Sequence, residues 1–146
     1  MVYLENSEEN IGINCLNIMP GQVKYFGDNL IDNHGQKLKV PHMGWNNIKT
    51  KDDPLFKNLK GDILLYFVHS YYAEKGKDTI ASTNYILDFS AAIRKDNFFA
   101  IQAHPEKSEQ LLQNILKQLL ENILKQLLEN ILKQLLQNIL KQLLQN

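Results

Sequence analysis

The sequence has a single cysteine, four prolines, no net charge and no run of eighteen apolar residues. One cysteine, Cys15, excludes an intramolecular disulfide framework and a zinc site built from several thiolates. Sixteen Lys and Arg balance sixteen Asp and Glu, which argues against the basic surface that nucleic acids or anionic membranes attract. The missing apolar run excludes a membrane-spanning helix, and the acidic start, residues 1–10, does not resemble a signal peptide. We therefore expect a cytoplasmic protein of 146 residues that binds neither membrane nor nucleic acid.

The last quarter of the chain is a tandem repeat of eight residues. The octad that begins at Leu111 recurs at Leu119, Leu127 and Leu135, and it is rich in good helix formers. Its apolar pairs recur every four residues, so the apolar stripe moves about 40° around a helix with each step. Such a stripe fits neither one flat core nor a left-handed coiled coil. Residues 111–146 are therefore either an oligomerisation or partner helix or a short repeat duplicated in the gene, and both alternatives predict self-association.

Residues 1–110 are interpreted as one β-rich domain made largely of hairpins. Segments rich in β-branched and aromatic residues alternate with turn-forming groups, and no Gly/Ser-rich linker divides them. Little remains to cover both faces of a sheet, so the domain looks incomplete. The predicted strands are Gln22–Phe26, Lys37–Val40, Asp62–His69, Thr79–Leu87, Phe89–Arg94 and Phe98–Ala103.

The strongest candidate for chemistry is the segment Ile101–Ser108, which lies between the last predicted strand and the helix. In extended backbone, residues i and i+2 point to the same side, and Pro105 fixes its own φ near about −65°. His104 and Glu106 can therefore form a base and its orienting carboxylate, the second and third members of a nucleophile–His–acid triad. The alternative is a structural His-Pro at a strand end, followed by an acid at a helix start.

Two further segments combine aromatic and polar residues. In Lys39–Asn46 the only tryptophan, Trp45, lies beside Met43 in a turn-like stretch. It either caps the core at a turn or is an exposed anchor for a partner. The segment Leu65–Tyr72 is an apolar strand that ends in a polar aromatic cluster, a common place for a site. The alternative there is a buried, hydrogen-bonded His69 at a sheet edge.

Taken in this order, these segments resemble class I glutamine amidotransferases, the family with a Cys-His-Glu triad. Within that family the sequence is most similar to the glutaminase subunits of imidazole glycerol phosphate synthase, over residues 1 to about 117. His104-Pro-Glu is shared by the wider class, whereas the pair Val40–Asn46 and Tyr66–Tyr72 is specific to this subunit. The matching stretches are Ser7–Glu9, Leu16–Gly21, Val40–Asn46, Tyr66–Tyr72 and His104–Ser108.

The resemblance implies a flavodoxin-like, doubly wound α/β fold and a glutaminase, which requires no metal and no other cofactor. The residue matching His104 carries the proton to departing ammonia, and the one matching Glu106 orients that imidazole. The residues matching Ser70 and Tyr71 help to hold the substrate glutamine.

The resemblance also implies a heterodimer with a cyclase subunit, a (β/α)8 barrel and lyase. This partner uses the ammonia to make imidazole glycerol phosphate in histidine biosynthesis, a pathway of amino-acid biosynthesis. The residues matching Met43, Trp45, Tyr66 and Lys107 lie towards that subunit, around the ammonia passage.

The departures from the family pattern are as informative as the matches. The family nucleophile sits in Gly-x-Cys-x-Gly-Met, and Met1 falls where that last Met would be. We therefore expect a truncated domain without its N-terminal half, a β-rich remainder plus the long C-terminal helix, inactive by itself. Cys15 lacks the flanking glycines and is expected to be a small buried residue. Ala103 stands where the family usually has Phe, which alters the packing beside His104.

Two other functions remain open. One is a paralogous amidotransferase that supplies ammonia to the biosynthesis of a modified surface sugar. The other is a non-catalytic remnant that binds a partner through the Trp45 surface and the helical tail.

Overall fold

The computed structural model describes residues 2–57, 59 and 61–144 and consists of nine strands, three short 3₁₀ helices and one long α-helix. The 3₁₀ helices are η1 (Glu9–Ile11), η2 (Pro54–Phe56) and η3 (Pro105–Lys107), and α1 spans Glu109–Leu144. The strands are β1 (Asn6–Ser7), β2 (Ile13–Asn14), β3 (Gln22–Tyr25), β4 (His42–Thr50), β5 (Ile63–His69), β6 (Tyr71–Ala73), β7 (Thr79–Tyr85), β8 (Leu87–Lys95) and β9 (Phe98–Ile101).

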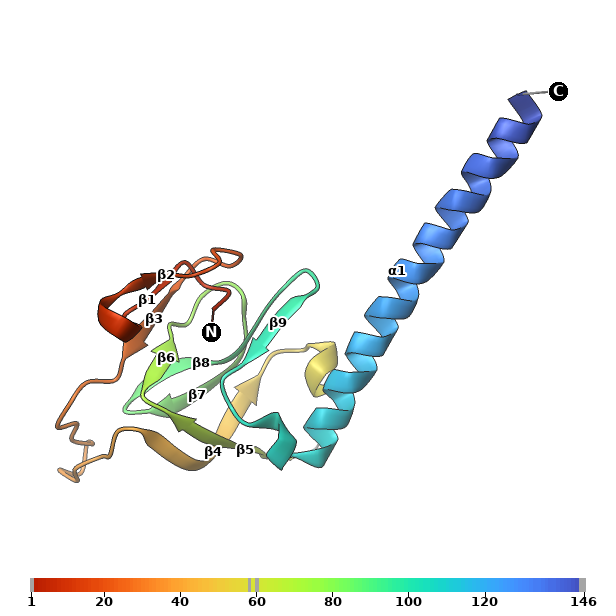
Figure 1. The fold of residues 1–146 in the computed structure, drawn as a ribbon. Coiled ribbons are helices and arrows are strands. Elements are labelled where there is room, and N and C mark those ends of the chain that lie inside the picture. Colours follow the sequence, from red (N-terminus) through yellow and green to blue (C-terminus); the bar gives the residue numbers. More distant parts are fainter. Residues whose placement is uncertain (1, 58, 60, 145–146) are drawn as a thin grey trace.

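The strands form one sheet in the order β2-β1-β3-β6-β8-β7-β4-β5, and β9 pairs with β8 (Figure 1). Among the described strands only β1 and β3 pair in parallel, and the other ladders are antiparallel. Strands β8 and β9 show why hairpins form here. Asp96 takes a φ of 54° in the two-residue turn between Lys95 and Phe98, a conformation that Asp tolerates.

Five of the six predicted strands are confirmed, with small shifts at their ends, as β3, β5, β7, β8 and β9. The strand predicted at Lys37–Val40 is wrong, because that segment makes only an isolated bridge from Lys37 to Ile31. The turn-like interpretation of Lys39–Asn46 is also wrong beyond Pro41, where β4 begins. Pro41 and Gly44 lower the β propensity of this stretch. It is nevertheless a strand, because seven of its residues pair with β5.

The main core lies on the inner face of β5 and β8 and extends to the start of α1. Leu65, Phe67 and Phe89 are almost fully buried in it, and Leu111 of α1 joins the same cluster. Side chains alternate across a strand, so the other side of β5 faces outwards and leaves Leu64 49% exposed. The sheet therefore has one packed face and one solvent-facing region along β4 and β5.

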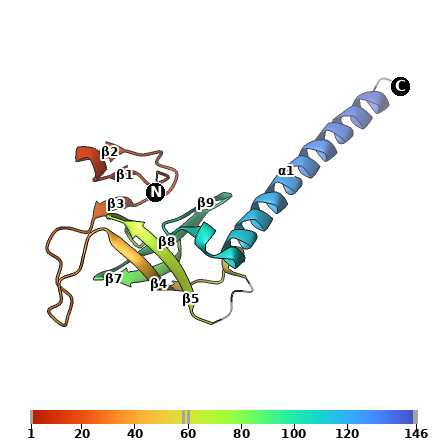
Figure 2. The same cartoon turned by 60° about the horizontal axis from the view of Figure 1, so that its bottom comes forward.

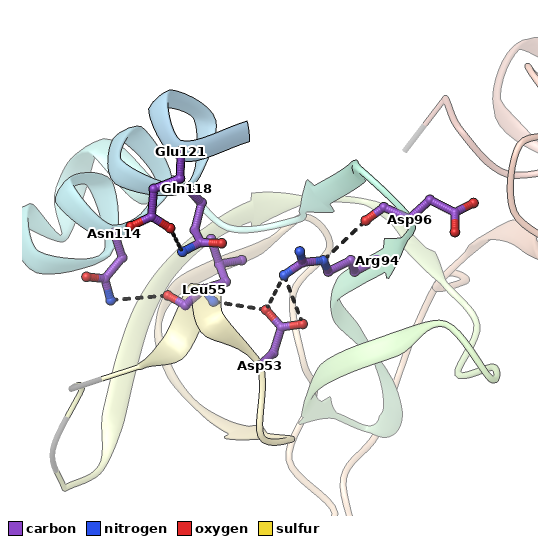
Figure 3. Close-up of polar contacts among 7 residues, drawn as sticks. All are labelled: Asp53, Leu55, Arg94, Asp96, Asn114, Gln118 and Glu121. Atoms are coloured by element: carbon purple, nitrogen blue, oxygen red, sulfur yellow. Dashed lines mark hydrogen bonds and ion pairs between the residues drawn. The ribbon is translucent and has the colours of Figure 1, made fainter. Parts of the chain in front are cut away.

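The start of helix α1 packs against η3 and against η2, where polar contacts join the two (Figure 3). Asn114 Nδ2 donates to the carbonyl oxygen of Leu55 at 3.2 Å. Asp53 caps η2 by accepting from the Leu55 N–H at 2.9 Å, and its carboxylate also pairs with Arg94 at 3.1 Å. This network ties α1, η2 and β8 together around Leu111, which is fully buried.

Beyond this anchor α1 extends away from the sheet (Figures 1 and 2). The helix predicted for the octads is confirmed, although residues 145–146 lie outside the described residues, as does Met1. Every Leu and Ile from Leu116 to Leu144 is between 43% and 79% exposed, so the drifting stripe finds no core to cover it. None of the described helices combines the length and the apolar character needed to cross a membrane.

Candidate active site and docking face

His104 and Glu106 meet directly where the chain leaves the sheet. The backbone N–H of His104 donates to the carbonyl oxygen of Tyr66 at 2.8 Å, which fixes this segment against the edge strand β5. Pro105 then begins η3, and this short helix turns Glu106 back. The result is a separation of 2.8 Å between His104 Nδ1 and Glu106 Oε1.

The charge of Glu106 determines which nitrogen of His104 is basic. Its own backbone N–H, followed by the His104 ring, lowers the pKa of the Glu106 carboxyl below its ordinary value. A carboxylate only accepts hydrogen bonds, so Nδ1 of His104 carries the hydrogen, and in the neutral ring Nε2 is the basic nitrogen. The His104 side chain is 44% exposed, so Nε2 belongs to an imidazole that solvent and substrate can reach.

Three of the four residues expected at a partner interface gather beside this pair. Trp45 lies directly across the β4–β5 ladder from Tyr66, with ring centroids 5.5 Å apart. Lys107 Nζ lies 4.2 Å from the centroid of the Tyr66 ring, and the His104 ring lies 6.4 Å from that ring edge to face. Tyr66 therefore links the histidine, the lysine and the tryptophan into one cluster.

Met43 extends this cluster along the outward side of the β4–β5 ladder. Met43 is 62% exposed and Trp45 is 56% exposed, with Leu64 and Val68 beside them on β5. Of the two alternatives for Trp45, core cap or exposed residue, the structure supports the exposed one. We call Met43, Trp45, Leu64, Tyr66 and Val68 the outer face.

Ser70 and Tyr71 lie apart from His104. They form the corner at which the chain leaves β5 and enters β6. Four residues of strand separate Ser70 from Tyr66, the backbone partner of His104, which corresponds to about 13 Å. The structure therefore joins His104 to Glu106, but it places Ser70 and Tyr71 beyond the end of β5.

A second histidine pair, His42 and His69, was missed by the sequence analysis. The two residues face each other in the β4–β5 register on the inner side of the sheet. His42 Nδ1 and His69 Nε2 are 3.0 Å apart, and the residues are only 3% and 9% exposed. The buried, hydrogen-bonded state considered for His69 is thus the one observed. Its partner could have been found only by setting the register between the two motifs.

Burial keeps this inner pair neutral. Loss of solvation, together with the neighbouring His69, lowers the pKa of His42 to about 4. Burial also lowers the pKa of His69, partly offset by its hydrogen bond to the backbone of Tyr71. Both imidazoles are therefore uncharged at neutral pH.

Cys15 lies at the opposite edge of the sheet. It follows β2, the first strand in the sheet order, whereas His104 contacts β5, the last. The expectation that Cys15 is buried is wrong, because it is only half-buried in a surface segment where Asn14 and Leu16 are exposed. Its position excludes it as the nucleophile for His104. Within the described residues no group of three His, Cys, Asp or Glu side chains is arranged to hold a metal.

The packed sheet, the C-terminal helix and the His–Glu pair define a class of enzyme domain. The chain belongs to the class I glutamine amidotransferases, because that family's model matches residues 15–135. Its relatives include the imidazole glycerol phosphate synthase subunit HisH of Pseudomonas putida, 47% identical over 120 residues, 77% of this chain and 56% of the relative. The subunit HisH of Acinetobacter baylyi is 49% identical over 122 residues, 78% of this chain and 57% of the relative. The chain therefore spans about half the length of the curated relatives that it matches.

These similarities confirm the expected family and the expected mixed α/β architecture, a β-rich portion followed by a long helix. The subunit HisH of Bacteroides fragilis gives the same result, at 47% identity over 111 residues, 76% of this chain and 54% of the relative.

Proposed function

We propose that this chain carries the proton-transfer part of a glutaminase, in the amidotransferase subunit of an imidazole glycerol phosphate synthase that serves histidine biosynthesis. The observation that supports this most directly is the 2.8 Å contact between His104 Nδ1 and Glu106 Oε1. It leaves Nε2 as the basic nitrogen, which is the arrangement that a triad histidine needs.

In this proposal His104 Nε2 first takes the proton from the thiol of the family's triad cysteine, which is not among the residues of this chain, and the thiolate attacks the amide carbon of glutamine. The carbon–nitrogen bond then breaks, and the imidazolium returns the proton to the departing nitrogen, which leaves as ammonia. Water hydrolyses the resulting thioester to glutamate. Glu106 stabilises the imidazolium in both steps. Cys15, the one cysteine in the sequence, is not the nucleophile, so we propose that the chain is inactive by itself.

The outer face supports a second part of the proposal, namely that a cyclase subunit with a (β/α)8 barrel docks there. Trp45 and Met43 are exposed and belong to the residue types that are enriched in interface cores, and Lys107 lies beside them over the Tyr66 ring. Because Tyr66 contacts both His104 and Trp45, ammonia released at His104 would leave next to this interface. Ser70 and Tyr71 are proposed to hold the glutamine, which approaches from the β5–β6 corner.

Docking can be tested by titrating the purified chain with the cyclase subunit in a calorimeter. We expect Trp45→Ala to weaken binding at least about tenfold, as removal of a central interface tryptophan does. Leu16→Ala is the matched control, because Leu16 is 62% exposed at the far edge of the sheet. Equal affinities for the two variants would show that the outer face does not bind the cyclase.

Activity is measured separately, as ammonia release from glutamine with and without the cyclase subunit. We expect the chain to hydrolyse glutamine no faster than its His104→Ala variant, because loss of the triad nucleophile costs orders of magnitude in rate. A His104-dependent rate above background would disprove the proposed inactivity.

We also propose that residues 111–146 mediate self-association. The exposed Leu and Ile side chains of α1 present far more apolar surface to water than isolated surface residues do. Sedimentation velocity of the chain should show species larger than a monomer. Replacing Leu127, Leu128, Leu135 and Leu136 by Gln should shift the population towards monomer. A single monomer peak for the unmodified chain would overturn this proposal.

A further inference from the structure

The His42–His69 pair connects the inner side of the sheet to the corner at Ser70 and Tyr71. His69 is the last residue of β5, Ser70 makes the bend, and Tyr71 begins β6. His69 Nδ1 lies 2.7 Å from the carbonyl oxygen of Tyr71. One side chain thus reaches across the bend to the backbone on its other side.

The hydrogen bonds of this pair run in one direction. A carbonyl oxygen only accepts, so Nδ1 of His69 carries the hydrogen and donates to Tyr71. Because the ring is neutral, its Nε2 is an acceptor, and His42 Nδ1 donates to it at 3.0 Å. We call this chain, from His42 through His69 to the Tyr71 carbonyl, the histidine relay.

Aromatic rings hold both imidazoles in place. His42 stacks on Tyr85 at 4.0 Å and on Phe67 at 5.1 Å, with interplanar angles of 19° and 20°. His69 packs against Phe26 and Phe89 at centroid distances of 5.3 and 5.2 Å. The two rings therefore have little rotational freedom, and they hold their hydrogen-bond directions fixed.

Backbone contacts to the β3 side also hold the corner. The Ser70 carbonyl accepts from the Phe26 N–H at 3.1 Å, and Tyr71 pairs with Tyr25 in the β3–β6 ladder. The relay therefore adds a side-chain connection from the corner to β4, beside the backbone ladder in which His42 and His69 are register partners.

We infer that His42 and His69 are positioning residues that set the geometry of the Ser70–Tyr71 corner through the histidine relay. This inference rests on the proposed function only in that Ser70 and Tyr71 are taken to hold glutamine. The relay itself acts on the backbone whether or not the substrate binds there.

The first test reads the relay directly in the unmodified chain. Nitrogen-15 NMR of the side chains distinguishes a ring nitrogen that carries hydrogen from one that accepts. We expect hydrogen on Nδ1 and none on Nε2 of His69 at pH 7. Hydrogen on Nε2 of His69, or a charged ring at that pH, would overturn the inference.

The second test uses two substitutions that each retain half of the relay. The amide nitrogen of Asn replaces Nδ1, so His69→Asn keeps the bond to Tyr71 and loses the one to His42. In His69→Gln the side-chain amide replaces Nε2 instead. This variant therefore keeps the bond from His42 and loses the bond to Tyr71. The reporter is hydrogen exchange of the Phe26 amide, which is bonded to the corner. We expect exchange about tenfold faster in His69→Gln and within about threefold of the unmodified chain in His69→Asn.

Equal acceleration in the two variants would show that His69 only fills space, and would overturn the relay. Glutamine affinity, measured on the same samples, separates the two proposals. If the unmodified chain does not bind glutamine, the substrate role of Ser70 and Tyr71 fails while the exchange data still decide the relay. If glutamine binds and only His69→Gln weakens it, the relay positions the substrate corner; equal weakening by both variants counts against that positioning.

Discussion

Two pairs of side chains in this protein each place a histidine Nδ1 close to an acceptor, yet their surroundings are opposite. His104 meets Glu106 at 2.8 Å on the surface, and His42 meets His69 at 3.0 Å in the core. The His104–Glu106 pair is exposed to solvent, and the histidine has a carboxylate as its partner. The second is enclosed by aromatic rings with a neutral partner. The same side chain is therefore suited to proton transfer at one place and to fixed geometry at the other.

The physical origin of the difference is the cost of charge. A carboxylate beside His104 stabilises the imidazolium that forms during proton transfer. In the core, loss of solvation lowers the pKa of His42 to about 4 and holds the ring neutral. The carboxylate of Glu106 thus favours positive charge on the neighbouring ring, whereas burial opposes positive charge on His42 and His69.

The largest expected effect is on stability. His42 is only 3% exposed, so His42→Ala removes a packed ring and leaves His69 Nε2 without its donor, which should cost about 3 kcal/mol in the free energy of unfolding. His104→Ala should change it by no more than about 0.5 kcal/mol, because the side chain is 44% exposed. Urea unfolding followed by circular dichroism measures both. Similar losses for the two variants would contradict the division into a structural and a chemical pair.

The next effect is on the pH dependence of stability. His42 has an ordinary pKa of 6.5 when unfolded and about 4 when folded, so the unfolded chain binds more protons between these values. Stability is therefore complete above pH 6.5 and falls as the pH drops towards 4, by up to about 3 kcal/mol. His69, whose pKa is also lowered, acts in the same direction.

This dependence is measured as the urea midpoint at several pH values. His42→Gln should flatten the slope between pH 6.5 and 4, since the titrating ring is gone. His104→Ala serves as the control and should retain the slope. A slope that persists unchanged in His42→Gln would assign the acid sensitivity to other groups.

The two pairs also differ in how far the sequence could predict them. His104 and Glu106 are two residues apart with a proline between them, so the sequence predicted their contact, although Glu106 reaches it through η3 and not through the extended backbone that was expected. His42 and His69 are 27 residues apart, and their contact depends on the register of β4 on β5. Register is set by the burial of one face of each strand, and a shift of one residue in either strand would have pointed the imidazole of that strand to solvent.

The same distinction applies to the fold. The octads predict α1 because helix propensity is local and repeats without Gly or Pro. Strand β4 was not predicted, because Pro41 and Gly44 lower the local β propensity. Its pairing with β5 stabilises it, and that pairing depends on residues far away in the sequence. The anchoring of α1 by Asn114 was equally hidden, since the same Asn occurs in every octad and only the first meets η2.

The smallest expected effect is a change in the pKa of Glu106, the partner of His104. The pKa of Glu106 is lowered first by its own backbone N–H, then by the His104 ring, and least by Lys107. His104→Ala should therefore raise this pKa only part of the way back to its ordinary value, because the backbone contribution remains. Lys107→Ala should raise it less. Carbon-13 NMR titration of the Glu106 carboxyl measures both shifts. If His104→Ala leaves the titration unchanged, the two side chains do not interact in solution, and Glu106 does not support proton transfer at His104.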